Sequence, residues 1–302
     1  MTRRAVLVMA YGTPLDLSEV EAYYTDIRRG KPPPPELLEE LTSRYRAIGG
    51  RSPLLEITSA QAAGIESRLD GVQVYIGQKH AHPFIADAIS RMQSDRVEFA
   101  AGLVLAPHYS VMSVGDYERR AQEAARGCGW KGTLNMVPSW HLEPGYIDFL
   151  IRAVEGARSE LTGEARQECI VLFTAHSLPS RILESGDPYP EQLRETAAAV
   201  AAQAGLDKWD TAWQSAGRTA EPWIGPDIME VLPTLKDRGV AGVIVCPCGF
   251  VADHLEVLYD VDIEARQLAR DLALPFARTR SPNTDPGFLD AVAAVASRAL
   301  TQ

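Results

Sequence analysis

Two stretches of the chain carry side chains that could bind a divalent cation or move protons. His176 directly follows an apolar run in "TAHSLPSR", where α/β proteins place functional side chains. Glu256, Asp260 and Glu264 recur at i, i+4 and i+8 in "DHLEVLYDVDIEAR", so they line one face of a predicted helix. Imidazole and carboxylate groups suit borderline divalent metals and can act as general bases. The residues alone leave two alternatives open, a histidine bonded to backbone and an acidic helix face in solvent.

The cysteines next to this acidic stretch favour a structural role. Cys246 and Cys248 would point the same way in a strand, but the single residue between them differs from the usual CxxC spacing, and no cysteine follows. Cys128 and Cys169 are isolated, and a chain of 302 residues does not need a disulfide framework. We therefore interpret Cys246 and Cys248 as small buried residues at the end of a strand.

Basic side chains gather in residues 17–69, which look like extra material on the first half of the chain. The proline run "GKPPPPE" at 30–36 cannot form a helix or a central strand, so it predicts a stiff connector between two helical patterns. The cationic residues here are Arg28, Arg29, Lys31, Arg44, Arg46 and Arg51. This local patch is the predicted binding place for an anionic ligand.

The composition excludes several classes of partner. The chain has 40 acidic and 30 basic residues, and its formal charge of -10 argues against nucleic acid and against an anionic bilayer. The apolar run from Ala5 to Ala10 is shorter than the ~7 to 15 residues of a signal-peptide core, and no stretch approaches the ~18 apolar residues of a membrane span. We expect a cytoplasmic protein without a membrane span.

Short apolar runs alternate with helical patterns along the chain. The runs occupy residues 5–10, 72–76, 99–106, 133–137, 169–175, 209–213, 240–246 and 273–277. This alternation predicts βαβ units and therefore an α/β protein with parallel sheets. A polar helical segment from about Pro144 to Glu168 is predicted to cross from the first half to the second.

The two halves resemble each other in sequence. "VLVMAYGTP", which contains Tyr11, matches "VLFTAHSLP", which contains His176, and "GLVLAPHYS" matches "GVIVCPCGF". We interpret the halves as two Rossmann-like, doubly wound domains, residues 1–150 and 151–302, that face a central cleft. Ligands of such sheets bind beyond the carboxyl ends of the strands, so Tyr11, His108, His176 and the 248–256 loop should meet in that cleft.

A set of short motifs, in order along nearly the whole chain, resembles one known family. The motifs are "VMAYGTP", "YYTDIRRG", "RYRAIGGRSPL", "YIGQKH", "VLAPHYS", "TAHSLPSR", "GDPYPEQL", "WQSAGR" and "GFVADHLEVLYD". The chain resembles the ferrochelatases, and within them the soluble coproporphyrin ferrochelatases of monoderm bacteria. That resemblance implies the chelatase fold and insertion of Fe²⁺ into coproporphyrin III to give its iron complex in haem biosynthesis.

The resemblance also implies roles for particular residues. His176 and Glu256 would be the catalytic residues and the Fe²⁺ ligands on one face of the macrocycle, and Tyr11 would approach the iron of the product from the other face. The residues that fall where the family contacts the porphyrin and its propionates are Arg28, Arg44, Tyr45, Ser52 and Tyr117. Asp260 and Glu264 match carboxylates of an outer cation site, which would take Mg²⁺.

Further expectations concern cofactors and partners. The resemblance implies Fe²⁺ as a substrate and no permanently bound cofactor, and no iron–sulfur cluster is expected because the chain ends at Gln302 without a cysteine-bearing extension. We expect a monomer that makes at most transient contact with another enzyme of the haem pathway. Two alternatives stay open: a cobalt or sirohydrochlorin chelatase, which shares the fold but typically uses a histidine pair, and a non-catalytic haem carrier.

Overall fold

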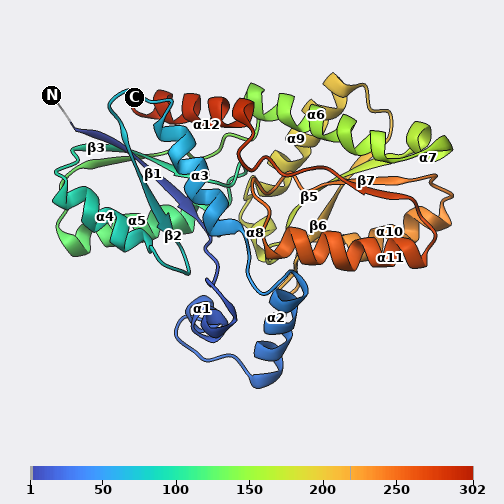
Figure 1. Cartoon of the computed structure of the whole chain (residues 1–302), viewed down its shortest axis with the longest axis horizontal. Coiled ribbons are helices and arrows are strands. Elements are labelled where there is room, and N and C mark those ends of the chain that lie inside the picture. Colours follow the sequence, from blue (N-terminus) through green and yellow to red (C-terminus); the bar gives the residue numbers. More distant parts are fainter. Residues whose placement is uncertain (1–2, 218, 302) are drawn as a thin grey trace.

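Two four-stranded parallel sheets form the framework of the molecule (Figure 1). The computed structural model describes residues 3–217 and 219–301. The first sheet has the order β2-β1-β3-β4, with strands Arg4–Ala10 (β1), Gln73–Gln78 (β2), Phe99–Val104 (β3) and Thr133–Met136 (β4). The second has the order β6-β5-β7-β8, with strands Ile170–His176 (β5), Trp209–Gln214 (β6), Val243–Cys246 (β7) and Phe276–Arg278 (β8). The eight predicted strands and the doubled topology are confirmed.

Helices cover both faces of the first sheet. α3 (Leu54–Glu66) and α12 (Pro286–Ala299) pack on one face, and α4 (Ile85–Ser94) and α5 (Val114–Cys128) on the other. The alternation of β1 explains this, because Val6 and Val8 enter one hydrophobic core while Leu7 and Met9 enter another. A strand buried on both faces reads as a continuous apolar run, as this one does.

The second sheet is covered in the same way. α6 (Pro144–Glu160) and α9 (Tyr189–Ala204) lie on one face, and α10 (Ile228–Asp237), η2 (Glu256–Ala265) and α11 (Arg266–Asp271) on the other. α6 and the short α7 (Gly163–Glu168) form the crossover predicted over residues 144–168. Because α12 returns from the second half to pack on α3 and β3, the cores of the two halves are continuous. A division into domains after residue 150 stays a prediction.

Residues 17–47 project away from both sheets (Figure 1). They form η1 (Leu17–Glu19), α1 (Val20–Ile27) and α2 (Pro35–Ala47), with residues 31–34 as the connector before α2. Pro35 is the first residue of α2, where its missing N–H costs no hydrogen bond. This unit lies over the region between the sheets, where the predicted cleft is.

The acidic segment differs from the expected α-helix. Residues Glu256–Ala265 form a π-helix, whose hydrogen bonds join residues i and i+5, before the chain continues as α11. π-helical turns are rare and occur frequently at functional sites. In the described part of the chain, no helix is both long and apolar enough to cross a membrane.

Candidate metal centre

His176 lies at the carboxyl end of β5 with 31% of its side chain exposed. Its Nδ1 lies against the carbonyl oxygen of Ser177, so Nδ1–H donates there and Nε2 is left facing the cleft. The hydroxyl of Tyr189 donates to the main-chain carbonyl of His176 at 3.0 Å. These contacts fix both the position of the residue and the nitrogen that it offers.

Glu256, the first residue of η2, lies between two imidazoles. Its Oε1 is 3.5 Å from Nε2 of His176, and its Oε2 is 3.6 Å from Nε2 of His254. The Nδ1 of His254 lies 3.0 Å from the carbonyl oxygen of Ala252, so this ring also turns Nε2 toward the carboxylate. The Glu256 carboxylate therefore has one imidazole at each oxygen, and a backbone carbonyl orients each imidazole, as is usual for metal-binding histidines. Within residues 3–217 and 219–301, however, no three His, Cys, Asp or Glu side chains are already arranged to hold a metal ion.

The charges of this pair are strongly coupled. Burial disfavours the imidazolium, but the neighbouring Glu256 carboxylate outweighs burial and raises the pKa of His176 to about 9. Burial likewise opposes ionisation of Glu256, yet His176 and then His254 hold the pKa of that carboxyl well below its usual range. Without a metal the pair is thus an imidazolium and a carboxylate at neutral pH. A metal ion must displace this proton, and the vacated pair can take one up again.

Tyr11, in the first half, directly follows the carboxyl end of β1. It is 42% exposed, and its ring lies 4.7 Å from the ring of His80 and 5.9 Å from Nζ of Lys79. Desolvation raises the pKa of the phenol, and the charge of Glu256 is the next largest cause. The Glu256 carboxylate is therefore within electrostatic reach of Tyr11, and the carboxyl ends of the two central strands meet as predicted.

Three of the predicted porphyrin contacts are buried: Tyr45 on α2, Ser52 between α2 and α3, and Tyr117 on α5. Tyr45 is 2% exposed and shares a 3.2 Å hydrogen bond with Thr13. Tyr117 is 5% exposed, with Nζ of Lys79 5.2 Å from its ring centre. Ser52 is also buried, and its hydroxyl accepts from the backbone N–H of Leu54 at 3.3 Å. The role of all three in binding a ligand stays a prediction.

Within the basic patch, Arg46 and Arg51 differ from Arg28 in whether a carboxylate already pairs with them. Arg46 pairs with Glu39 at 2.6 Å and Arg51 pairs with Glu56, each on the surface with more than half of its side chain exposed. Arg28 is half-buried, and its Nε finds no hydrogen-bond partner within residues 3–217 and 219–301. A buried donor without a partner is costly, which makes Arg28 the arginine best suited to an incoming carboxylate.

Arg44 connects α2 to the π-helix of the second half. Its Nη2 lies 3.1 Å from Glu40 and its Nη1 3.2 Å from Oδ1 of Asp260, while its guanidinium lies over the ring of Tyr259 at 5.0 Å. A predicted propionate contact and a predicted outer ligand are thus bonded to each other. A porphyrin carboxylate at Arg44 would compete with Asp260.

The acidic residues of η2 form a ladder that leads outward from Glu256. Burial, followed by the charge of Glu256, raises the pKa of Asp260 to about 6, and the hydroxyl of Ser215 donates to this carboxylate. The charge of Glu264 acts on both Asp260 and Tyr259, so the three side chains are neighbours. The predicted alignment of Glu256, Asp260 and Glu264 therefore persists in the wider helix, and cation binding there stays a prediction.

Other expectations need correction or addition. His108 does not line the cleft; it is 1% exposed between the halves, with Nε2 2.9 Å from Oγ1 of Thr196. Cys246 and Cys248 are buried free thiols, as interpreted.

The sequence analysis missed two residues of the site, His254 and Ser215. His254 could have been noticed because it stands two residues before Glu256, whereas Ser215 is revealed only by its left-handed backbone, with φ of 62°, and its bond to Asp260. The last residue of "WQSAGR", Arg218, lies outside the described residues.

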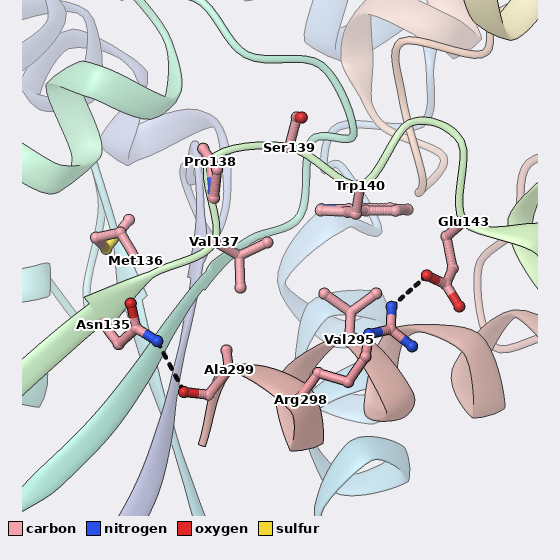
Figure 2. Close-up of a pocket in the computed structure, with 10 residues that line it drawn as sticks. All are labelled: Asn135, Met136, Val137, Pro138, Ser139, Trp140, Glu143, Val295, Arg298 and Ala299. Atoms are coloured by element: carbon pink, nitrogen blue, oxygen red, sulfur yellow. Dashed lines mark hydrogen bonds and ion pairs between the residues drawn. The ribbon is translucent and has the colours of Figure 1, made fainter. Parts of the chain in front are cut away.

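A pocket of about 190 Å³ lies elsewhere, between the end of β4 and the C-terminal part of α12 (Figure 2). Its charged and amide side chains are already engaged, because Arg298 pairs with Glu143 and Asn135 donates to the carbonyl of Ala299 at 2.9 Å. None of its lining residues belongs to the predicted site. It gives no support to a second centre of chemistry.

The chain is similar to proteins of known activity. A family model described as "Ferrochelatase" matches residues 3–300. The "Coproporphyrin III ferrochelatase" of Geobacillus kaustophilus is 45% identical over 297 residues, which cover 96% of this chain and 94% of that protein. The "Coproporphyrin III ferrochelatase 1" of Bacillus thuringiensis subsp. konkukian is 46% identical over 292 residues, covering 94% of each. Among solved structures, the cobalt complex of the sirohydrochlorin chelatase SirB from Bacillus subtilis subspecies spizizenii superposes with a TM-score of 0.63 at 10% identity, covering 99% of this chain and 96% of that one.

Proposed function

The chain belongs to the ferrochelatase family, and we propose that it inserts Fe²⁺ into coproporphyrin III, with His176 and Glu256 as the metal ligands and proton acceptors. The observation that carries the residue roles is the convergence of Nε2 of His176 and the Glu256 carboxylate at 3.5 Å, at the end of β5. The Nε2 of His254 faces the other carboxylate oxygen at 3.6 Å, so His254 would orient Glu256.

The electrostatics of this pair suit metal insertion. An incoming Fe²⁺ must displace the proton that Glu256 stabilises on His176, so the site binds iron without holding it irreversibly. Two pyrrole N–H protons leave as iron enters the macrocycle. Since the vacated pair has a high proton affinity, His176 is placed to accept one of these protons as the metal departs.

The rest of the cleft would hold the macrocycle against this centre. Tyr11, exposed on the first half, would face the iron from the opposite side. Arg28, whose Nε has no hydrogen-bond partner among the described residues, would take a propionate. Tyr45, Ser52 and Tyr117 would contact the macrocycle. Binding energy from the propionates can support bending of the ring, which turns the nitrogen lone pairs toward the metal.

A preference for coproporphyrin III is the first expected result. Coproporphyrin carries four propionates and protoporphyrin IX two, and residues 17–47 present basic and proline-rich sequence where a hydrophobic lip would be needed for a membrane-associated substrate. We expect kcat/KM for coproporphyrin III to exceed that for protoporphyrin IX by ~10-fold or more, a difference of ~1.4 kcal/mol in the barrier. Anaerobic, detergent-free assays with Fe²⁺ and both porphyrins measure it.

Arg28→Ala should erode this preference, whereas Arg46→Ala is the matched control because Arg46 is exposed and paired with Glu39. Equal or better use of protoporphyrin by the wild type would refute the substrate assignment and leave the chelatase activity intact.

The second candidate function is a cobalt or sirohydrochlorin chelatase, which the SirB-like fold and the additional histidine His254 favour. The same porphyrin panel, extended to sirohydrochlorin and Co²⁺, tests it. A haem carrier would stop at one equivalent of product, whereas an enzyme turns over.

The outer cation site gives a second expectation. We propose that Asp260 and Glu264 hold a Mg²⁺ ion, which carboxylates bind through one or two oxygens. Glu264→Gln should then raise the Mg²⁺ concentration for half-maximal activation about threefold, the scale of one partly exposed charge interaction, and leave the KM for porphyrin unchanged. An identical Mg²⁺ dependence in the variant would mean that these acids are only a solvated helix face.

The remaining proposals follow from the family. We propose that Fe²⁺ is used as a substrate, that no cofactor is permanently bound, and that the protein acts as a cytoplasmic monomer. Contact with another enzyme of the haem pathway would be transient. Size-exclusion chromatography with light scattering tests the oligomeric state.

A further inference from the structure

Arg278, at the end of β8, is a nearly buried arginine outside the predicted site, with 14% of its side chain exposed. Its Nε and Nη2 donate to the two carboxylate oxygens of Asp262 at 2.9 and 2.7 Å. Its Nη1 donates to Oδ1 of Asp253 at 3.2 Å. The contact with Asp262 has the two-bond geometry in which arginine binds a carboxylate most strongly. With its third nitrogen the same guanidinium also bonds Asp253, so it joins two acids that lie nine residues apart in the sequence.

The chain between these two acids carries the metal site. Asp253 directly precedes His254, and Asp262 lies within the π-helix that begins at Glu256. Arg278 therefore holds both ends of the segment that contains His254 and Glu256. Their neighbour on the other side, His176, is fixed independently by β5.

The end at Asp253 is anchored further. Its carboxylate accepts from the hydroxyl of Ser281 at 2.7 Å and from the amide of Asn283 at 2.8 Å, and its backbone N–H donates to Oδ1 of Asn283 at 2.8 Å. The buried amide of Gln61, on α3, donates to the carbonyls of Val251 and Asn283, both at 2.9 Å. This network ties the loop before His254 to the loop after Arg278 and to the first half of the molecule.

The π-helix explains why such an anchor matters. A long run of i to i+5 hydrogen bonds is intrinsically unfavourable relative to an α-helix, so neighbouring structure must hold it. Rewinding toward an α-helix would rotate Glu256 about the helix axis while His176 stayed on its strand. The 3.5 Å approach of Glu256 to His176 therefore depends on contacts that fix η2 at a distance from the metal, and the two bonds from Arg278 to Asp262 are such contacts.

We infer that Arg278 is a positioning residue for the proposed metal centre, which holds the Asp253–Asp262 segment so that Glu256 lies between His176 and His254. This inference rests on the proposed role of His176 and Glu256 as Fe²⁺ ligands. It assigns to Arg278 an effect on metal binding and not on porphyrin binding. The guanidinium is engaged with Asp253 and Asp262, so its effect is expected to pass through His254 and Glu256.

The test compares metal and porphyrin parameters in Arg278→Gln, Arg278→Lys and Asp262→Asn. We expect Arg278→Gln to raise the KM for Fe²⁺ and the Kd for Co²⁺ alone, titrated without porphyrin, by about tenfold or more, the usual effect of removing an outer partner of a metal ligand. The KM for coproporphyrin III should change less than about twofold. Arg278→Lys keeps the charge and loses the fork, so it should recover part of the metal affinity. Arg280→Gln is the control, because Arg280 is exposed and pairs with Asp285.

Unchanged Fe²⁺ and Co²⁺ parameters in folded Arg278→Gln, or an equal rise in the two KM values, would overturn the inference. If Arg278→Gln does not fold, Asp262→Asn decides in the same way, because it leaves the bond from Arg278 to Asp253 in place. A wild-type protein that binds Co²⁺ but makes no metalloporphyrin would refute the proposed function alone, and the Co²⁺ comparison would still test Arg278.

Discussion

Replacing His176 by alanine is expected to lower kcat/KM for iron insertion about a thousandfold, ~4 kcal/mol of barrier, while coproporphyrin III still binds. The substitution removes the nitrogen that faces Glu256 at 3.5 Å and with it the group whose pKa is raised to about 9. Metal ligation and proton acceptance are lost together. The arginines that would hold the propionates, Arg28 directly after α1 and Arg44 on α2, are untouched.

Anaerobic absorbance assays give the rate of iron insertion, and quenching of porphyrin fluorescence gives the affinity of the variant for coproporphyrin. His82→Ala is a suitable control, because 79% of the His82 side chain is exposed. More than about a tenth of wild-type turnover in His176→Ala, which is only ~1.4 kcal/mol, would remove His176 from the mechanism. A loss of porphyrin binding as large as the loss of rate would instead indicate a collapsed cleft.

The fold was open to prediction because its signals are local. Each strand is a short apolar run that the sheet buries on both faces, as Val6 to Met9 show by alternating between two cores. The repeat of "VLVMAYGTP" in "VLFTAHSLP" predicted the doubled topology, and it brought Tyr11 and His176 to the same place, the carboxyl ends of the central strands. Position at a strand end is a property that a linear pattern can convey.

The shape of the metal centre was less predictable, because it depends on contacts between distant parts of the chain. Nothing in "DHLEVLYDVDIEAR" distinguishes a π-helix from an α-helix, since the difference comes from tertiary partners. Arg44 lies 216 residues from Asp260, and Ser215 lies 45 residues from it, yet both bond to its carboxylate. Arg278 pairs with acids on both sides of the ligands without belonging to any motif. Side chains that position a proposed metal-binding residue are harder to recognise in a sequence than the metal-binding residue itself.

For His108 the sequence predicted a place in the site that the packing of the two halves does not allow. It stands in the motif "VLAPHYS", at the end of a strand, and so was expected in the cleft. Instead its ring packs 5.8 Å from that of His141 and 6.2 Å from that of Tyr189, whose hydroxyl holds the His176 carbonyl. A strand end predicts where a residue is, but the packing of the two halves decides whether it is exposed. His108 belongs to the interface that supports the centre.

That burial leads to the second large effect, which concerns stability in acid. Desolvation, with a smaller contribution from His141, lowers the pKa of His108 to about 3, compared with ~6.5 in an unfolded chain. From pH 6.5 down to about 3, therefore, the unfolded state binds one more proton than the folded state, and stability falls with pH. At pH 4.5 this histidine alone should remove about 2.5 kcal/mol from the free energy of unfolding measured at pH 7. Urea titrations at the two pH values measure this fall in the free energy of unfolding. The fall should be smaller by this amount in His108→Gln, because the glutamine amide can still donate to Thr196 but does not titrate. In the exposed control His82→Gln the fall should equal that of the wild type. If His108→Gln loses as much stability as the wild type on acidification, the imidazole is not held neutral by burial, and the interface must admit its charge.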